Sequence, residues 1–375
     1  MPLEYLGEFE GFNINLNDPD TFGFIEAKII VPNNILIPLL PFKYRGMTIH
    51  PVGSWIGIYF SEELKAVENL GYQIQILKLY KLSKTDLFSE YVNRFFEIKR
   101  NSTGSAKFIA KMLLNTLYGY FGRKLTMIDT KNILTKDLGY YLTKYSVFSI
   151  ININDKISTL LLSNNLDYTL LNELNSEMSI DIQSPFRKVQ SNVAIASAVT
   201  AYARIAMMRY KLISGINIFY FDTDSIFTDK PISEHLIGDD LGLMKDELNG
   251  GIIKKAYFLG IKKYGFVDDS NIVKSVFSGV ERNSLTFNEI ESIAKGNIIL
   301  KTISNRFYKD FKSLNISIST SSLSIKFDTF KTLKDNFYYP IKVHISLRNR
   351  FSFYERLIIS RVRSLINKFK SLIEA

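Results

Sequence analysis

The chain has 375 residues, a formal net charge of +10 and a pI of about 9.3, and 46% of its residues are hydrophobic. This length allows two or three compact units with buried cores, and the charge favours a polyanionic partner, although a basic solvated surface would give the same balance. Cysteine is absent, which excludes disulfides and thiol nucleophiles. The three histidines are far apart in sequence, so no histidine-based metal site is predicted, and no uncharged apolar stretch is long enough to span a bilayer, so no membrane partner is predicted.

The first part of the chain, residues 1–84, mixes strand and helix signals. Apolar, β-prone runs mark strand candidates at residues 27–31, 35–40, 54–60 and 73–79. Ser61 resembles a helix N-cap, because two glutamates follow it, and the helix it opens ends at Gly71. This region is therefore expected to be α+β.

Two helices are predicted next, at about 87–100 and 106–121. A short polar connection, Asn-Ser-Thr-Gly-Ser, joins them and forces an antiparallel helical hairpin.

The second of these helices carries a polar motif. Lys111, Asn115 and Tyr118 are spaced i, i+4 and i+7, so they share one helix face, and Gly119 follows. A lysine neutralises phosphate and an aromatic ring supports a base or a sugar. A solvent-facing stripe on an amphipathic helix would explain any one of these residues equally well.

Residues 125–188 have no clear periodicity and are interpreted as an inserted subdomain. Helical spacing of small and apolar residues then predicts a helix over 189–212. We expect this helix to pack on the sheet that carries an acidic hairpin at residues 216–227. A further helix is predicted at 240–248. Beyond Thr286, the pattern indicates a helix at 288–295, an edge strand at 316–320 and a basic helical tail from Arg348, which a solvated helix face would also explain.

The segment 216–227 reads as a tight hairpin with Asp222, Thr223 and Asp224 at its turn. Its flanking residues are apolar, so the strands are expected to be buried on both faces. Buried carboxylates need compensating charge, and Mg²⁺ is the natural ion for oxygen ligands without His or Cys. Aspartate is also a common turn residue, which explains the triplet alone about as well.

A third motif, Lys262-Lys263-Tyr264, follows about forty residues later and is not specific by itself. The three motifs in this order resemble those of family B DNA polymerases, and most closely the protein-primed branch found in certain bacteriophages, adenoviruses and linear mitochondrial plasmids. Subsidiary similarities occur at 200–204, at 278–280 and at the Thr286-Phe287 pair.

The resemblance implies a role for each motif. Asp224 would be the direct metal ligand and Asp222 its catalytic companion, with two Mg²⁺ ions serving the reaction. The implied nucleotide-binding residues are Lys111, Asn115, Tyr118 and Gly119. The implied primer-binding residues are Tyr220, Thr223, Lys262 and Tyr264. The expected partners are template-primer DNA, dNTPs and, for this branch, a terminal protein primer.

The resemblance also implies a right-hand polymerase architecture of α+β class, with an antiparallel-sheet palm, helical-hairpin fingers and a small thumb. The expected divisions are 1–84 for the first part of the palm with an insertion-like region, 85–124 for the fingers, 125–188 for the inserted subdomain, 189–285 for the palm core, and 286–375 for the thumb and basic tail. The family's Asp-x-x-Ser-Leu-Tyr-Pro motif and its exonuclease domain are not found, so a C-terminal portion of a polymerase is expected. The Asp18-Pro-Asp20 sequence is a poor substitute because it lies in a Pro-interrupted loop.

The expected function is DNA-directed DNA polymerisation in the replication of a linear plasmid or organellar DNA. The abundance of Ile, Asn, Lys, Phe and Tyr points to an AT-rich genome, and together with the family likeness it predicts a mitochondrial location. The sequence also allows two alternatives. One is a non-catalytic DNA-binding remnant of a polymerase gene, and the other is an aspartic-protease-like site, in which Asp224 would replace the glycine expected after Asp-Thr.

Overall fold

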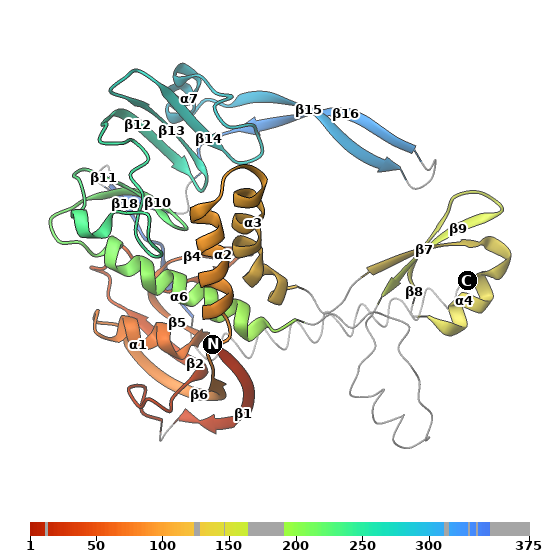
Figure 1. Ribbon diagram of the computed structural model, residues 1–375, viewed down its shortest axis with the longest axis horizontal. Coiled ribbons are helices and arrows are strands. Elements are labelled where there is room, and N and C mark those ends of the chain that lie inside the picture. Colours follow the sequence, from red (N-terminus) through yellow and green to blue (C-terminus); the bar gives the residue numbers. More distant parts are fainter. Residues whose placement is uncertain are drawn as a thin grey trace. The chain divides into compact units, whose positions relative to one another are not determined.

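The computed structural model describes residues 1–11, 14–123, 128–145, 147–163, 191–310, 315–328, 331–334 and 337–345 (Figure 1). The chain divides into two compact units that alternate along the sequence. Unit 1 comprises Met1–Glu90, Ser197–Glu247 and Thr329–Ala375, and unit 2 comprises Tyr91–Ala196 and Leu248–Asp328. In the described part of the chain, no helix is long and apolar enough to cross a membrane.

Unit 1 is built on a five-stranded sheet with the strand order β1-β6-β2-β5-β19. Its strands are β1 (Pro2–Glu10), β2 (Gly23–Val31), β5 (Val52–Phe60), β6 (Gln73–Lys84) and β19 (Lys342–His344). Neighbouring strands are antiparallel except β19, which pairs parallel to β5. The central strand β2 alternates strictly between buried and half-buried residues, because one face of an antiparallel sheet packs on a core.

Two helices pack on this sheet. The helix α1 (Ser61–Glu68) places Leu64 and Val67 in the main core beside Trp55. The helix α6 (Val193–Lys211) contributes Ala198 and Ala201, which are fully buried in a second cluster with phenylalanines of the sheet region. Alanine on that face lets the helix backbone approach closely. The helix was predicted to pack on the sheet that carries residues 216–227, and this is wrong, because those residues form a separate two-stranded sheet.

The remaining elements of unit 1 are short. Among the described residues they include the hairpins β3 (Phe42–Tyr44) with β4 (Met47–Ile49), β10 (Ile218–Asp222) with β11 (Ser225–Thr228), and β17 (Thr332–Lys334) with β18 (Phe337–Tyr339), and a 3₁₀ turn at Glu234–Leu236.

Unit 2 contains the predicted helical hairpin and three β structures. The hairpin consists of α2 (Ser89–Asn101) and α3 (Gly104–Phe121). The β structures are the sheet β7-β9-β8 (Ile128–Leu134, Ile157–Ser163, Val147–Asn152) with the 3₁₀ turn Thr135–Asp137 and α4 (Leu138–Lys144), the sheet β12-β13-β14 (Ile253–Gly260, Lys263–Asp268, Val273–Phe277) with α7 (Phe287–Ala294), and the ribbon of β15 (Ile299–Asp310) and β16 (Asn315–Ile325). The helix α7 begins with a capping box between Thr286 and Glu289, and it buries Ile290 and Ile293 in a core shared with β12, β14 and β16.

Two predicted elements are wrong. Residues 35–40 form no strand, because Pro38 interrupts the run and the Leu39 amide donates to the Tyr72 hydroxyl at 2.8 Å instead of to a neighbouring strand. Residues 240–248 form no helix. Gly242 has a left-handed φ of 89° there, and the Met244 amide donates to the Leu236 carbonyl at 3.0 Å in an irregular turn.

The role of Ser61 also differs from the prediction. It is the first residue of α1 and not its N-cap, which is Phe60 without a side-chain cap. The Ser61 hydroxyl is buried and accepts the Gly23 amide at 3.2 Å, so it ties the helix to β2. The predicted basic tail from Arg348 lies outside the described residues, as does much of the inserted subdomain beyond Ser163.

Candidate active site

The acidic hairpin has the predicted two-residue turn. Asp222 at the end of β10 pairs with Ser225 at the start of β11, and Thr223 and Asp224 form the turn between them. The Thr223 hydroxyl donates to the Asp222 Oδ1 at 3.1 Å, and the Ser225 hydroxyl donates to the Asp222 carbonyl at 3.0 Å. Thr223 adopts a left-handed φ of 51°, which is unusual for a β-branched residue and marks a strained turn.

The strands of this hairpin are not buried on both faces, in contrast to the prediction. Asp222 is half-buried, Asp224 is exposed and Phe219 is 62% exposed. The reason is topological, since within the described residues β10 and β11 form a two-stranded sheet of their own and no further strand pairs with it. Both carboxylates lie at a turn where water, an ion or a phosphate can reach them.

The helix α6 contacts the hairpin through its last residue and not through its alanine face, which packs on the five-stranded sheet. The Lys211 ammonium lies 3.9 Å from the centre of the Phe221 ring, one residue before Asp222. Burial, with a smaller contribution from the Arg204 charge, lowers the pKa of Lys211 to about 8. Lys211 was not among the predicted site residues, because a lysine in the last turn of a helix is common.

The donor set of the turn fits a magnesium ion. Within the described ranges, no group of three or more His, Cys, Asp or Glu side chains could hold a metal. Asp222 and Asp224 nevertheless supply hard oxygen donors on either side of one residue. Mg²⁺ is commonly held by only one or two carboxylates, with water and substrate phosphates completing its shell.

The polar motif of α3 lies on an open helix face. Lys111, Asn115 and Tyr118 are exposed, whereas Leu113 and Leu117 between them are half-buried. A Cβ atom added at Gly119 would meet no atom within 4 Å. The helix therefore presents a cation, an amide and a ring on one accessible side, as the spacing predicted.

The Lys-x-Tyr motif lies at the turn between β12 and β13. Lys262 has a left-handed φ of 52°, and its carbonyl accepts the Ser278 amide at 2.9 Å. Tyr264 stands opposite Phe258 on β12, with ring centres 6.3 Å apart, and opposite Val276 on β14. The central position of β13 thus fixes the tyrosine, while the lysine sits at the turn.

The sequence motifs are distributed over both units. The acidic hairpin, with Tyr220, Asp222, Thr223 and Asp224, belongs to unit 1. The α3 motif and the Lys262–Tyr264 motif belong to unit 2.

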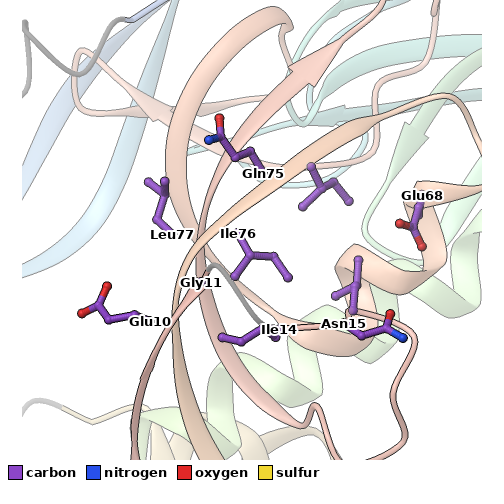
Figure 2. Close-up of a pocket in the computed structure, with 10 residues that line it drawn as sticks. Glu10, Gly11, Ile14, Asn15, Glu68, Gln75, Ile76 and Leu77 are labelled. Carbon is purple, nitrogen blue, oxygen red and sulfur yellow. The ribbon is translucent and has the colours of Figure 1, made fainter.

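A pocket of about 630 Å³ lies elsewhere in unit 1. Figure 2 shows the residues that line it, which come from the end of β1, the loop after it, the last residue of α1 and β6. None of the motif residues is among them, so this pocket is separate from the acidic hairpin's turn.

Two further polar residues, Asn217 and Asp229, close the open end of the acidic hairpin. The Asp229 carboxylate accepts the Asn217 backbone amide at 2.7 Å and the Asn217 side-chain amide at 2.8 Å. These residues were missed at the sequence level. Their only signal there is symmetry, since each lies five positions from one of the two aspartates at the turn.

Comparison with solved structures supports the expected polymerase fold. The chain is similar to phi29 DNA polymerase complexed with primer-template DNA and incoming nucleotide substrates, with a TM-score of 0.56 and 16% identity over 88% of this chain and 55% of that one. The structure of phi29 DNA polymerase complexed with single-stranded DNA gives the same TM-score over 87% of this chain. The expected α+β polymerase fold is confirmed by this similarity.

The sequence relatives are fungal. The chain is 32% identical to the "Probable DNA polymerase" of Podospora anserina over 83% of its length, and 27% identical to that of Ascobolus immersus over 88%. It spans only about a quarter of each relative, 27% and 26% respectively. The family profile for DNA polymerase type B, organellar and viral, matches residues 5–214, more than half of the chain. The protein therefore belongs to the organellar and viral type B DNA polymerases.

Proposed function

We propose that this chain carries the nucleotidyl-transfer site of a DNA-directed DNA polymerase, which adds deoxynucleotides to a primer 3′-hydroxyl. The observation that carries the proposal is the turn of the acidic hairpin. In a chain of this family, this turn holds two hard-oxygen donors, the half-buried Asp222 and the exposed Asp224. Template-primer DNA and dNTPs are the substrates that this role requires.

The acidic hairpin would hold Mg²⁺ through Asp224 and Asp222. When bound, the metal supplies charge neutralisation for the primer hydroxyl and for the leaving pyrophosphate. Thr223 holds the Asp222 carboxylate through its hydroxyl at 3.1 Å, and Tyr220 packs on Phe227 with ring centres 6.0 Å apart. These two residues would keep the turn in shape beside the primer.

The α3 motif would bind the incoming nucleotide. Lys111 is placed to neutralise the triphosphate, and Asn115, Tyr118 and Gly119 offer an amide, a ring and an open space on the same helix face. Lys262 and Tyr264 would contact the primer terminus from the β12–β13 turn.

We assign the regions of the chain to the parts of a right-hand polymerase as the resemblance implied. The fingers are 85–124, the inserted subdomain 125–188, the palm 1–84 and 189–285, and the thumb begins at residue 286. The order α2–α3, acidic hairpin, β12–β14 sheet and β15–β16 ribbon supports this assignment.

The biological setting is also a proposal. The family description, organellar and viral, and the fungal relatives support replication of a linear plasmid or organellar DNA in the mitochondrion. A terminal protein primer is proposed on the likeness of the motifs to the protein-primed branch.

Primer extension tests the function. The 375-residue chain is assayed alone and joined to the in-frame segment upstream in its gene, with Mg²⁺, dNTPs and a labelled primer-template. Extension that Asp224→Asn abolishes supports the proposal. Salt-dependent DNA binding without extension by either protein would instead identify a non-catalytic DNA-binding remnant.

A further inference from the structure

The two strands of the acidic hairpin are joined at their open end by a compact set of hydrogen bonds. The Asp229 carboxylate accepts two N–H groups of Asn217, from the backbone at 2.7 Å and from the side chain at 2.8 Å. The Asp229 backbone amide donates to the Asn217 carbonyl at 3.1 Å. We call this set the Asn217–Asp229 clamp.

An irregularity in the ladder separates the clamp from the turn. Phe221 pairs with Ile226 and Tyr220 with Phe227, but the next pair is Ile218 with Thr228, so β10 has one extra residue, Phe219. Such a bulge makes two residues of one strand oppose one residue of the other. The ladder on the turn side of the bulge is only three pairs long.

A short ladder beside a bulge specifies its register weakly. A slip of one residue would turn every side chain of a strand to the opposite face, and with it the Asp222 carboxylate at the end of β10. Burial does not oppose such a slip here, because the two strands form an isolated sheet and none of their residues is fully buried. The clamp opposes it, since a slipped Asn217 could not offer both N–H groups to one carboxylate.

We propose that Asp229 and Asn217 are positioning residues for nucleotidyl transfer, which hold the register that orients the Asp222 and Asp224 carboxylates at the turn. The inference rests on the proposed function, because it gives the hairpin's geometry a catalytic purpose. Two neighbouring bonds support the same end of the hairpin, from the Lys230 ammonium to the Gly215 carbonyl at 3.0 Å and from the Thr228 hydroxyl to the Lys230 carbonyl at 2.8 Å.

Four variants of the clamp and one control separate geometry from charge. Asp229→Ala removes both side-chain bonds. Asp229→Asn keeps them, because its Oδ1 accepts the Asn217 backbone amide and the Asn217 side chain can rotate to accept the new N–H. The exchange Asn217→Asp with Asp229→Asn restores the pair in reverse, whereas Asn217→Asp alone sets two carboxylates against each other. Asp239→Ala, which removes an exposed aspartate of unit 1 outside the hairpin, is the control for lost charge.

The primary readout is metal binding, measured with Mn²⁺ as the probe by the paramagnetic signal of the free ion. We expect Asp229→Ala and Asn217→Asp to weaken Mn²⁺ binding by about tenfold, since a hydrogen bond to a charged group is worth roughly that factor or more. The Mn²⁺ affinities of Asp229→Asn, the exchanged pair and Asp239→Ala should stay within about twofold of the wild-type affinity. A twofold change corresponds to less free energy than the weakest hydrogen bond to a charged group contributes. In primer extension the two damaging variants should lower kcat and leave the KM for dNTP unchanged.

The outcomes distinguish the inference from the function on which it rests. If the wild type binds Mn²⁺ and Asp229→Ala binds it equally well, the clamp has no positioning role and the inference is overturned alone. An Asp229→Asn variant as weak as the alanine variant also overturns it, because charge and not register would then matter. If the wild type neither binds Mn²⁺ nor extends a primer, the proposed function fails and the inference fails with it.

Loss of folding is checked separately. Amide hydrogen exchange is measured on the hairpin and on the five-stranded sheet of each variant. Faster exchange confined to residues 217–229 supports a local loss of register. If a variant unfolds throughout, the test uses Asp229→Asn and the exchanged pair instead. Mn²⁺ binding by these two proteins that equals wild-type binding supports the inference, and weaker binding overturns it.

Discussion

Glu63 on α1 and Arg204 on α6 form a two-pronged ion pair in unit 1. The Arg204 Nη2 lies 2.8 Å from the Glu63 Oε2, and its Nε bonds the other carboxylate oxygen. The Glu63 side chain is only 4% exposed, whereas that of Arg204 is 30% exposed. The pair joins the two helices that cover the five-stranded sheet, and the carboxylate depends on it more than the guanidinium does.

Removing Arg204 should therefore destabilise unit 1 strongly. Arg204→Ala leaves a buried carboxylate unpaired, at an expected cost of about 3–5 kcal/mol in the free energy of unfolding. Glu63→Ala should cost less, because the exposed part of the guanidinium can turn to water. Urea unfolding measures both. Lys65→Ala breaks the neighbouring pair with Glu62 and should cost under about 1 kcal/mol, since both side chains of that pair reach solvent. Equal costs for Arg204 and Lys65 would contradict the prediction.

The stability of unit 1 should fall as the pH drops below about 6.5. Burial, reinforced by the charges of Lys211 and Arg204, lowers the pKa of His50 to about 4, while a bond from the ring to the Leu39 carbonyl at 3.1 Å opposes the shift. The unfolded chain binds a proton to this residue near pH 6.5 and the folded protein only near pH 4, so stability is lost between these values, by on the order of 3 kcal/mol in total. Urea unfolding from pH 7 to 4 measures this slope. His50→Gln should flatten it, and an unchanged slope would assign the loss to other groups.

Asp224 should serve metal binding and not stability. Asp224→Asn removes one member of a like-charge pair at the turn, so the fold without metal should be unchanged or slightly more stable. Mg²⁺ at a hundredfold excess over its dissociation constant should stabilise the wild type by about 2.7 kcal/mol and the variant by much less. Thermal melts with and without the ion test this. If the wild type gains nothing from Mg²⁺, or the variant gains as much, Asp224 is a turn residue only.

Gly119 separates folding from nucleotide binding in unit 2. A Cβ atom there meets no neighbour, and alanine favours a helix over glycine by up to about 1 kcal/mol, so Gly119→Ala should raise the melting temperature slightly. If the incoming nucleotide packs against this face of α3, the same methyl group should raise the KM for dNTP. Steady-state extension with varied dNTP measures this effect. An unchanged KM would place the nucleotide elsewhere.

Local signals in the sequence predicted much of this structure. The helices α3 and α7 follow from periodicity, and the two-residue turn at Thr223 and Asp224 follows from β-prone runs on either side. The exposure of the acidic hairpin did not follow, because its apolar residues resemble those of a buried strand. Burial depends on which strands become neighbours in a sheet, and in the described part of the chain no third strand pairs with β10 or β11.

The failures at residues 35–40 and 240–248 have a common cause. Both runs have the apolar content of a regular element, but each contains a residue, Pro38 or Gly242, that allows another backbone path. Tertiary bonds then decide, through Tyr72 in the first case and Leu236 in the second. The Asn217–Asp229 clamp was missed for a related reason, since an exposed Asn and Asp at a strand end look like ordinary turn residues.

The parallel pairing of β19 with β5 sets an order of events on the ribosome. Val343 lies against Gly53, whose φ of 101° and lack of a side chain admit the Val343 carbonyl, and the two residues are separated by the whole of unit 2 in the sequence. At ordinary rates of translation, about 15 to 60 s pass between the synthesis of the two strands. During that interval β5 is an open edge of the nascent sheet. An open edge can pair with a strand of another chain, so neighbouring nascent chains on one polysome are the copies most exposed to incorrect strand pairing.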